Sequence, residues 1–153
     1  MDHIIKISEA TAIALHAMAL LAQRPPGQPL SVKQIAGTLG ISADHLSKIL
    51  QRLEKELLVQ SVRGPKGGYL IVPMAAQLPM LKVFAIFEGP LSFSGCLMRR
   101  SVCKTKPCSL SLLLGNLHDQ IIDFLKKTRI KDINPFDVSL TRSHAHAGST
   151  GKR

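Results

Sequence analysis

The chain is short of three things: long apolar runs, acidic residues and cysteines. A bilayer-spanning helix needs roughly 20 consecutive apolar residues, and since no run approaches that length we expect no membrane protein. The start of the sequence has neither the basic flank nor the cleavage site of an export signal, which predicts a cytoplasmic protein. Three cysteines without an export signal do not suit a disulfide framework, so metal or redox chemistry is the alternative for the thiols.

The shortage of acidic residues leaves a strongly basic chain. Lysine and arginine number 20 against 10 acidic residues, which gives a formal net charge of +10. Such an excess attracts polyanions, so nucleic acid is the first partner to consider and a membrane surface is the competing interpretation. The length of 153 residues suits one compact domain with appendages and leaves little room for a second core.

Apolar periodicity predicts three helices in the first third of the chain. Residues 7–22 are apolar on nearly every face, which is typical of a helix buried by its neighbours. A second, short helix begins at Ser31, where Gln34 completes a capping box, and ends at Gly40. The third helix begins at the N-cap Ser42 and runs to about residue 57, with an inner face formed by Leu46, Ile49, Leu50, Leu53 and Leu57.

A short turn at residues 39–42 joins the second helix to the third and contains a glycine. A turn of this length is what a helix-turn-helix needs to cross its helices steeply. Residues 58–62 and 69–72 are β-branched runs on either side of a glycine-rich segment, which predicts a hairpin directly behind the third helix. A hairpin in that position is a wing. The predicted fold class is therefore mainly α, a winged helix-turn-helix with a small β-hairpin wing.

The second half of the chain predicts two more helices and a tail. Pro79 opens a helix that Gly89 and Pro90 end. Residues 109–127 form a long last helix whose apolar stripe is too large for a small monomer to cover, and we interpret it as a dimerisation helix. No apolar period follows Pro135, which predicts disorder. The expected organisation is a DNA-binding domain, a cysteine-bearing sensor loop, the dimerisation helix and a disordered tail, at residues 1–90, 91–108, 109–134 and 135–153.

The exposed face of the third helix is the candidate reading surface, because an α-helix fits the major groove of DNA. Lys48 can contact guanine or phosphate, whereas phosphates would repel Asp44, which suits a cytosine amine or a capping role. Arg63 and Lys66 at the hairpin tip can enter the minor groove. A merely solvated helix face and a hairpin that caps the core are the simpler interpretation. The candidate contacts on the helix are Ser42, Asp44, His45, Ser47, Lys48 and Arg52.

Residues 57–69, which read LLVQSVRGPKGGY, resemble the wing signature of the Rrf2 family of bacterial regulators. The resemblance extends to segments 35–36, 40–42 and 46–50 of the helix-turn-helix and to residues 88–91, and it covers the chain from about residue 4 to 133. It implies a homodimer that reads a partly palindromic double-stranded DNA operator, with the recognition helix in the major groove. The family's wing arginine, which enters the minor groove, is matched by Arg63.

All three cysteines lie in one loop, with six residues between Cys96 and Cys103 and four between Cys103 and Cys108. Three soft ligands suit an iron-sulfur cluster, with zinc second because its structural sites usually bring paired Cys-x-x-Cys motifs and four ligands. The family's cluster-binding members, among them its iron-sulfur-cluster regulator and its nitric-oxide-sensitive repressor, carry three cysteines in this loop. The resemblance thus implies a 2Fe-2S or 4Fe-4S cluster. Small buried hydrophobic side chains or mobile thiols are the alternative.

The family's fourth cluster ligand is missing from its expected positions, because its histidine would fall at Ser111 and its first-helix acidic residue at Ala12. His16 lies one helical turn beyond Ala12 on the same face. In relatives the partner's first helix approaches the cluster, so His16 is the nearest substitute. His118, Glu9 or an exogenous ligand are the alternatives.

These observations predict a homodimeric transcriptional regulator, a repressor more than an activator, that senses iron-sulfur status, redox stress or nitric oxide through a cluster. No enzyme is expected. A cofactor-free regulator of the same fold, sensing through thiols, zinc or a protein partner, is the alternative. A thiol or electron-transfer oxidoreductase would lack Cys-x-x-Cys and leave the basic wing unexplained. A winged helix that binds protein instead of nucleic acid is the remaining interpretation.

Overall fold

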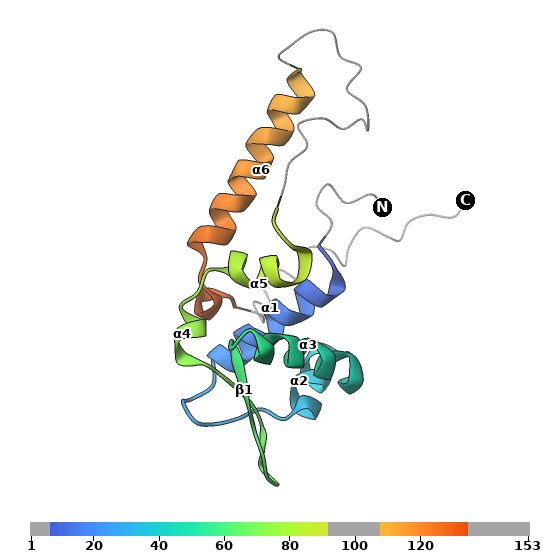
Figure 1. The fold of residues 1–153 in the computed structure, drawn as a ribbon, viewed down its shortest axis with the longest axis vertical. Coiled ribbons are helices and arrows are strands. Elements are labelled where there is room, and N and C mark those ends of the chain that lie inside the picture. Colours follow the sequence, from blue (N-terminus) through green and yellow to red (C-terminus); the bar gives the residue numbers. More distant parts are fainter. Residues whose placement is uncertain (1–6, 92–107, 135–153) are drawn as a thin grey trace, which may run out of the picture.

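The computed structural model describes residues 7–91 and 108–134, and within them a helical body carries two projections. The hairpin of strands β1 and β2 projects from one end and helix α6 from the other (Figure 1). Among the described residues no helix is long and apolar enough to cross a bilayer. The elements in chain order are α1 (Glu9–Ala22), α2 (Val32–Leu39), α3 (Ala43–Lys55), β1 (Val59–Val62), β2 (Gly68–Ile71), α4 (Pro73–Ala76), α5 (Met80–Glu88), α6 (Ser109–Lys127) and a 3-10 helix, η1 (Ile130–Asp132).

Helix α1 forms the centre of the helical body, as its apolar composition predicts. Its N-cap is Ser8, whose side chain accepts a hydrogen bond from the backbone N–H of Thr11. The helix contacts α2, α3, α5, β2 and η1, so almost every face is covered. Burial of so many apolar side chains is the main favourable contribution to folding. The buried α1 residues are Thr11, Ile13, Ala14, Leu15, Ala17, Met18, Ala19 and Leu21.

The helix-turn-helix is confirmed, and local sequence signals define its boundaries. The Ser31 side chain accepts from the Gln34 N–H at 3.2 Å while the Gln34 side chain accepts from the Ser31 N–H at 2.9 Å, which completes the capping box. Gly40 ends α2 with a φ of +66°, a left-handed conformation that glycine adopts without steric cost. Ser42 then caps α3 by accepting from the His45 N–H at 3.2 Å.

The prediction that Leu57 lies on the inner face of the third helix is wrong. Helix α3 ends at Lys55, and Leu57 adopts a φ of +57° with 78% of its surface exposed. The N–H of Leu58 bonds to the carbonyl of Leu53 at 3.0 Å and that of Leu57 to Glu54 at 2.9 Å, the bonding pattern of a Schellman motif. This reversal turns Leu57 outward and places Leu58, which is 3% exposed, in the core.

The wing is a two-stranded antiparallel hairpin in which Ser61 lies opposite Tyr69. A third segment joins its inner edge, because the backbone groups of Leu30 and Tyr69 exchange hydrogen bonds of 3.0 and 2.8 Å. Gly68 permits this approach, since a Cβ there would lie 2.2 Å from the Leu30 carbonyl oxygen. The predicted hairpin is therefore confirmed and is anchored to the segment that precedes α2.

Apolar periodicity does not predict the short elements that follow the wing and follow α6. The short helix α4 follows the wing, and Pro79 is the N-cap of α5 instead of its first helical residue. Beyond α6, the Ile130 N–H bonds to the carbonyl of Leu78 at 3.0 Å. The Ile130 side chain is fully buried in the core. Helix α6 is thus anchored at its C-terminal end.

Candidate nucleic-acid interface

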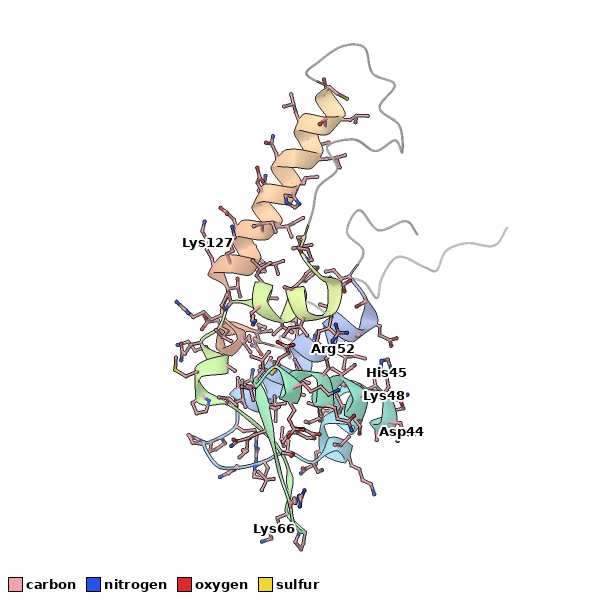
Figure 2. The ribbon with its side chains drawn as sticks, viewed as in Figure 1. Asp44, His45, Lys48, Arg52, Lys66 and Lys127 are labelled. Atoms are coloured by element: carbon pink, nitrogen blue, oxygen red, sulfur yellow. The ribbon has the colours of Figure 1, made fainter. Side chains whose placement is uncertain are left out.

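Helix α3 presents a polar face opposite its buried leucine face. Ser42, Asp44 and Lys48 are exposed, and His45 and Ser47 are half-buried. Figure 2 shows Asp44, His45 and Lys48 together at the N-terminal end of the helix. The Ser47 hydroxyl donates to the Ala43 carbonyl at 2.8 Å, which holds it along the helix. The structure therefore brings the predicted residues of the first two turns onto one surface.

Arg52 is placed differently from the other predicted contacts. Its guanidinium donates to the Ile86 carbonyl and lies 4.8 Å from the centroid of the Phe87 ring. Ile86 belongs to the last turn of α5, whose carbonyls have no partner within the helix. Arg52 therefore caps α5 and joins α3 to the segment that leads toward the cysteines.

The tip of the wing carries Arg63 and Lys66, both of which are exposed. Lys66 lies at the far end of the hairpin in Figure 2. The turn is closed by a 2.9 Å hydrogen bond from the Gly67 N–H to the Gly64 carbonyl, with Pro65 in the position that favours its fixed φ. A Cβ on Gly67 would lie 2.2 Å from the Val62 carbonyl, so the tip is tight. Two cationic side chains are thus presented on a narrow support.

Glu54 is a residue of this surface that the sequence reasoning missed. Its Oε1 accepts from the Ser61 N–H at 3.0 Å and from the Ser61 hydroxyl at 2.6 Å, so it connects α3 to the wing. These hydrogen bonds, the side-chain one first, hold the pKa of the Glu54 carboxyl below its usual 4.5. Burial, aided by the Glu54 charge, raises the pKa of the Tyr69 phenol. No local pattern signals a contact between residues on two different elements.

The predicted metal ligands are only partly within the described residues. Cys108 is half-buried at the N-cap position of α6, whereas Cys96 and Cys103 lie outside the described residues. In residues 7–91 and 108–134, no three histidine, cysteine or acidic side chains gather closely enough to hold a metal ion. Three thiolates and an imidazole are nonetheless a donor set that suits an iron-sulfur cluster.

His16 is exposed on α1 and its ring is oriented by a 2.7 Å hydrogen bond between Nδ1 and the Ala12 carbonyl. A carbonyl accepts, so Nδ1 donates in this hydrogen bond and Nε2 is the ring nitrogen that could coordinate a metal. His16 lines a cavity of about 170 Å³ together with Leu39 and Ile41 of the helix-turn-helix. The imidazole thus lies beside the turn that positions α3.

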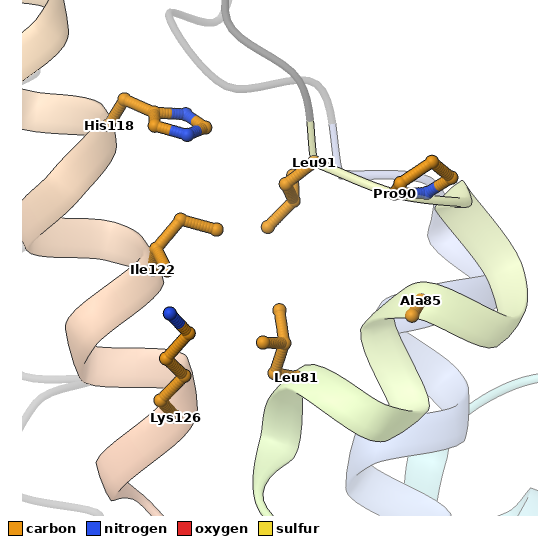
Figure 3. Close-up of a pocket in the computed structure, with 7 residues that line it drawn as sticks. All are labelled: Leu81, Ala85, Pro90, Leu91, His118, Ile122 and Lys126. Carbon is orange, nitrogen blue, oxygen red and sulfur yellow. The ribbon is translucent and has the colours of Figure 1, made fainter.

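His118 lies elsewhere, in a groove of about 350 Å³ between α5 and α6. Figure 3 shows His118 and Lys126 on α6 facing Leu81 and Leu91 across this groove. Leu91 is the last described residue before the cysteines. The groove is largely apolar, in keeping with the exposed side chains Leu110, Leu112, Leu113 and Phe124 elsewhere on α6.

Glu88 fastens the end of α5 to the start of α1. Its Oε1 accepts from the Ser8 N–H at 2.8 Å, from the Ser8 hydroxyl at 2.6 Å and from the hydroxyl of the buried Thr11. A carboxylate at a helix N-terminus also interacts favourably with the helix dipole. The segment that leads to the cysteines is therefore fixed to α1 by Glu88 and to α3 by Arg52.

A pair of packed helices joined by a short turn, the polar face of the second helix and a basic hairpin directly behind it define a winged helix-turn-helix DNA-binding protein. The family model described as "Rrf2: Iron-dependent Transcriptional regulator" matches residues 7–135. The chain belongs to the Rrf2 family.

The similar proteins are transcriptional regulators. The HTH-type transcriptional regulator IscR of Pectobacterium atrosepticum is 29% identical over 129 residues, which cover 84% of this chain and 79% of the relative. A putative HTH-type transcriptional regulator of Aquifex aeolicus is 30% identical over 129 residues, which cover 82% of this chain and 89% of the relative. The solved structure of CymR, the global cysteine regulator of B. subtilis, matches with a TM-score of 0.69 at 26% identity and covers 84% of this chain and 95% of that one. This chain is accordingly a DNA-binding transcriptional regulator and not an enzyme.

Proposed function

We propose that the protein is a homodimeric repressor that places α3 in the major groove of its operator and the wing in the adjacent minor groove. The observation that carries this proposal is the exposed polar face of α3, followed directly by a tight wing with cationic residues at its tip. The net charge of +10 supports it, because phosphate neutralisation supplies much of the affinity for DNA.

The residues proposed to contact DNA divide by position. Ser42, Asp44, His45, Ser47 and Lys48 contact bases and phosphates from the first two turns of α3. The wing residues Arg63 and Lys66 contact the minor groove and its phosphates. Arg52 is exposed but acts by joining α3 to α5, because its guanidinium is engaged by the Ile86 carbonyl and the Phe87 ring.

The proposed dimer uses the apolar stripe of α6. Leu110, Leu112, Leu113 and Phe124 each expose more than half of their surface, and Leu125 is the only buried residue among those described on this helix. Exposed apolar side chains in such number favour association. A second chain packed along α6 would cover them.

We further propose that Cys96, Cys103 and Cys108 hold a 2Fe-2S or 4Fe-4S cluster, with His16 as the fourth ligand. Helix α6 has 19 residues and so extends about 28 Å, carrying Cys108 away from the helical body that contains His16 (Figure 1). His16 would therefore reach the cluster of the second chain. A bound cluster supplies a redox- and nitric-oxide-sensitive signal, and the orientation of His16 Nδ1 toward Ala12 supports its role as a ligand.

A cofactor-free regulator that senses through thiols, zinc or a protein partner is the second candidate. The similarity to CymR, named as a global cysteine regulator, favours it. The two candidates share the DNA-binding surface and differ in what the cysteines bind.

The DNA-binding proposal is tested by selecting duplexes from a random library with the wild-type protein and then measuring their affinity for variants. Lys48→Ala should cost roughly 1 to 3 kcal/mol at specific positions if Lys48 contacts guanine. Arg63→Ala should weaken binding chiefly at A/T-rich flanks. The matched control is Lys127→Ala, which removes the same charge from α6, where Lys127 is paired with Asp123 at 3.3 Å. Equal losses for all three variants would contradict the proposal.

The cluster proposal is tested by anaerobic purification with visible absorbance and with iron and acid-labile sulfide counted per chain. The wild type should be coloured, and Cys103→Ala and His16→Ala should each lose iron. His45→Ala, which removes a histidine from α3, is the control and should retain it. A colourless wild type after anaerobic reconstitution would reject the cluster and favour the cofactor-free candidate.

A further inference from the structure

Hydrogen bonding in the wing turns the backbone N–H of Ser61 toward the outer edge of the hairpin. The N–H and the carbonyl of Tyr69 both bond to Leu30, at 2.8 and 3.0 Å. In an antiparallel ladder a residue bonds to one side only, so Tyr69 and its opposite residue Ser61 form a non-hydrogen-bonded pair. The Ser61 N–H therefore points away from β2 and needs another partner.

Glu54 is that partner, and it lies on the last turn of the recognition helix. It accepts both the backbone and the hydroxyl hydrogen of Ser61, at 3.0 and 2.6 Å. Ser61 of β1 precedes the wing arginine, Arg63, by two residues along the chain, and Arg63 directly follows the strand. Glu54 is thus the contact that joins the outer edge of the wing to the helix proposed to read the major groove.

The charge of Glu54 makes this contact informative. A carboxylate near a DNA-binding surface weakens the attraction of phosphates, so on electrostatic grounds alone its removal should strengthen binding. The two hydrogen bonds of Glu54 predict instead that its removal weakens DNA binding, because they fix the wing relative to α3.

We propose that Glu54 is a positioning residue for DNA recognition: by holding Ser61, it sets the angle between the recognition helix and the wing at which Arg63 reaches the minor groove. The inference rests on the proposed function, since it assigns Glu54 an effect that passes through Arg63. It extends that function because the contact between Glu54 and Ser61 then determines how α3 and the wing bind the two grooves together.

Glu56 provides a matched control for charge. It is an exposed carboxylate at the C-cap of the same helix, and the described contacts give its side chain no bond to the wing. Glu56→Ala and Glu54→Ala remove equal charge, and alanine preserves the helix in both. Glu54→Gln keeps an oxygen that can accept from Ser61 and removes only the charge.

The test measures affinity for a duplex selected by the wild-type dimer, with each variant made alone and together with Arg63→Ala. Glu54→Ala should weaken binding by about fivefold, whereas Glu54→Gln and Glu56→Ala should bind as tightly as the wild type or more tightly. In the Arg63→Ala background, Glu54→Ala should cost less than about twofold, because the arginine it positions is gone. Amide exchange of Ser61 in the free protein should accelerate in Glu54→Ala and not in Glu56→Ala.

The possible negative results separate the positioning role of Glu54 from the proposed DNA-binding function. Equal behaviour of Glu54→Ala and Glu56→Ala, or a fivefold loss that persists without Arg63, would overturn the positioning role while leaving the DNA-binding proposal in place. Unchanged Ser61 exchange would overturn it without reference to DNA. If Arg63→Ala alone did not weaken binding, the proposed use of the wing would fail, and the positioning role would fail with it.

Discussion

Replacement of Arg52 separates two roles that the sequence does not distinguish. A hydrogen bond from a charged donor contributes about 1.5 to 3 kcal/mol and an exposed cation–π contact about 0.5 to 1 kcal/mol. Because the Arg52 side chain is exposed to solvent, we take the lower part of this range and expect Arg52→Ala to destabilise the protein by about 2 kcal/mol. In a chain of this length that corresponds to a fall in Tm of about 4 to 8 °C.

The DNA-binding measurement for Arg52 is the salt dependence of affinity. Each lost phosphate contact lowers the slope of log K against log salt by about one. Arg52→Ala should leave this slope unchanged, whereas Lys48→Ala should reduce it if Lys48 contacts a phosphate, with little effect on Tm. Arg52→Lys should keep the charge and still lose most of the stabilisation that Arg52 contributes, since lysine cannot reproduce the planar stacking on Phe87. A reduced slope with unchanged Tm in Arg52→Ala would refute this reasoning.

Three further predictions follow from contacts elsewhere in the protein. Glu88→Ala should lower the free energy of unfolding by about 2 to 3 kcal/mol in denaturant titrations, because it removes the charged acceptor that the Ser8 N–H, the Ser8 hydroxyl and the buried Thr11 hydroxyl share. Gly68→Ala should disrupt the pairing with Leu30 and speed exchange of the Tyr69 amide, since the new Cβ would lie 2.2 Å from a carbonyl oxygen. Because the pKa of Glu54 is lower in the folded protein than its unfolded value near 4.5, the ionised carboxylate stabilises the fold at pH values above 4.5. This stabilisation is lost as the pH falls through the pKa of the folded state. Glu54→Gln should therefore flatten the dependence of Tm on pH below 4.5, measured against Glu56→Gln.

The features of the fold that depend on neighbouring residues could be predicted from the sequence. Ser31, Gly40 and Ser42 set helix ends through hydrogen bonds and backbone conformations that span a few residues. The glycine-rich tip predicts the hairpin because a tight turn needs residues without a Cβ at the position of Gly67. These signals sufficed for the winged helix-turn-helix.

The contacts that join distant elements could not be predicted. Arg52 meets Ile86 across 34 residues and Glu88 meets Ser8 across 80, and no local pattern encodes either pairing. Arg52 has the right spacing for the exposed face of α3, so periodicity alone groups it with Lys48. Leu57 fits the apolar stripe by spacing, but the helix ends two residues earlier, at Lys55, and the chain reverses at Leu57.

Footprinting of both grooves on a selected duplex is the measurement that shows whether α3 and the wing engage DNA together. Dimethyl sulfate reports guanine N7 in the major groove, and hydroxyl radicals report the minor groove. If both elements bind, guanines should be protected in two half-sites separated by about 10 base pairs or a multiple of it. Minor-groove protection should lie beside each half-site, and Arg63→Ala should remove it while the guanines stay protected. Minor-groove protection unaffected by Arg63→Ala, or an absence of protected guanines, would contradict it.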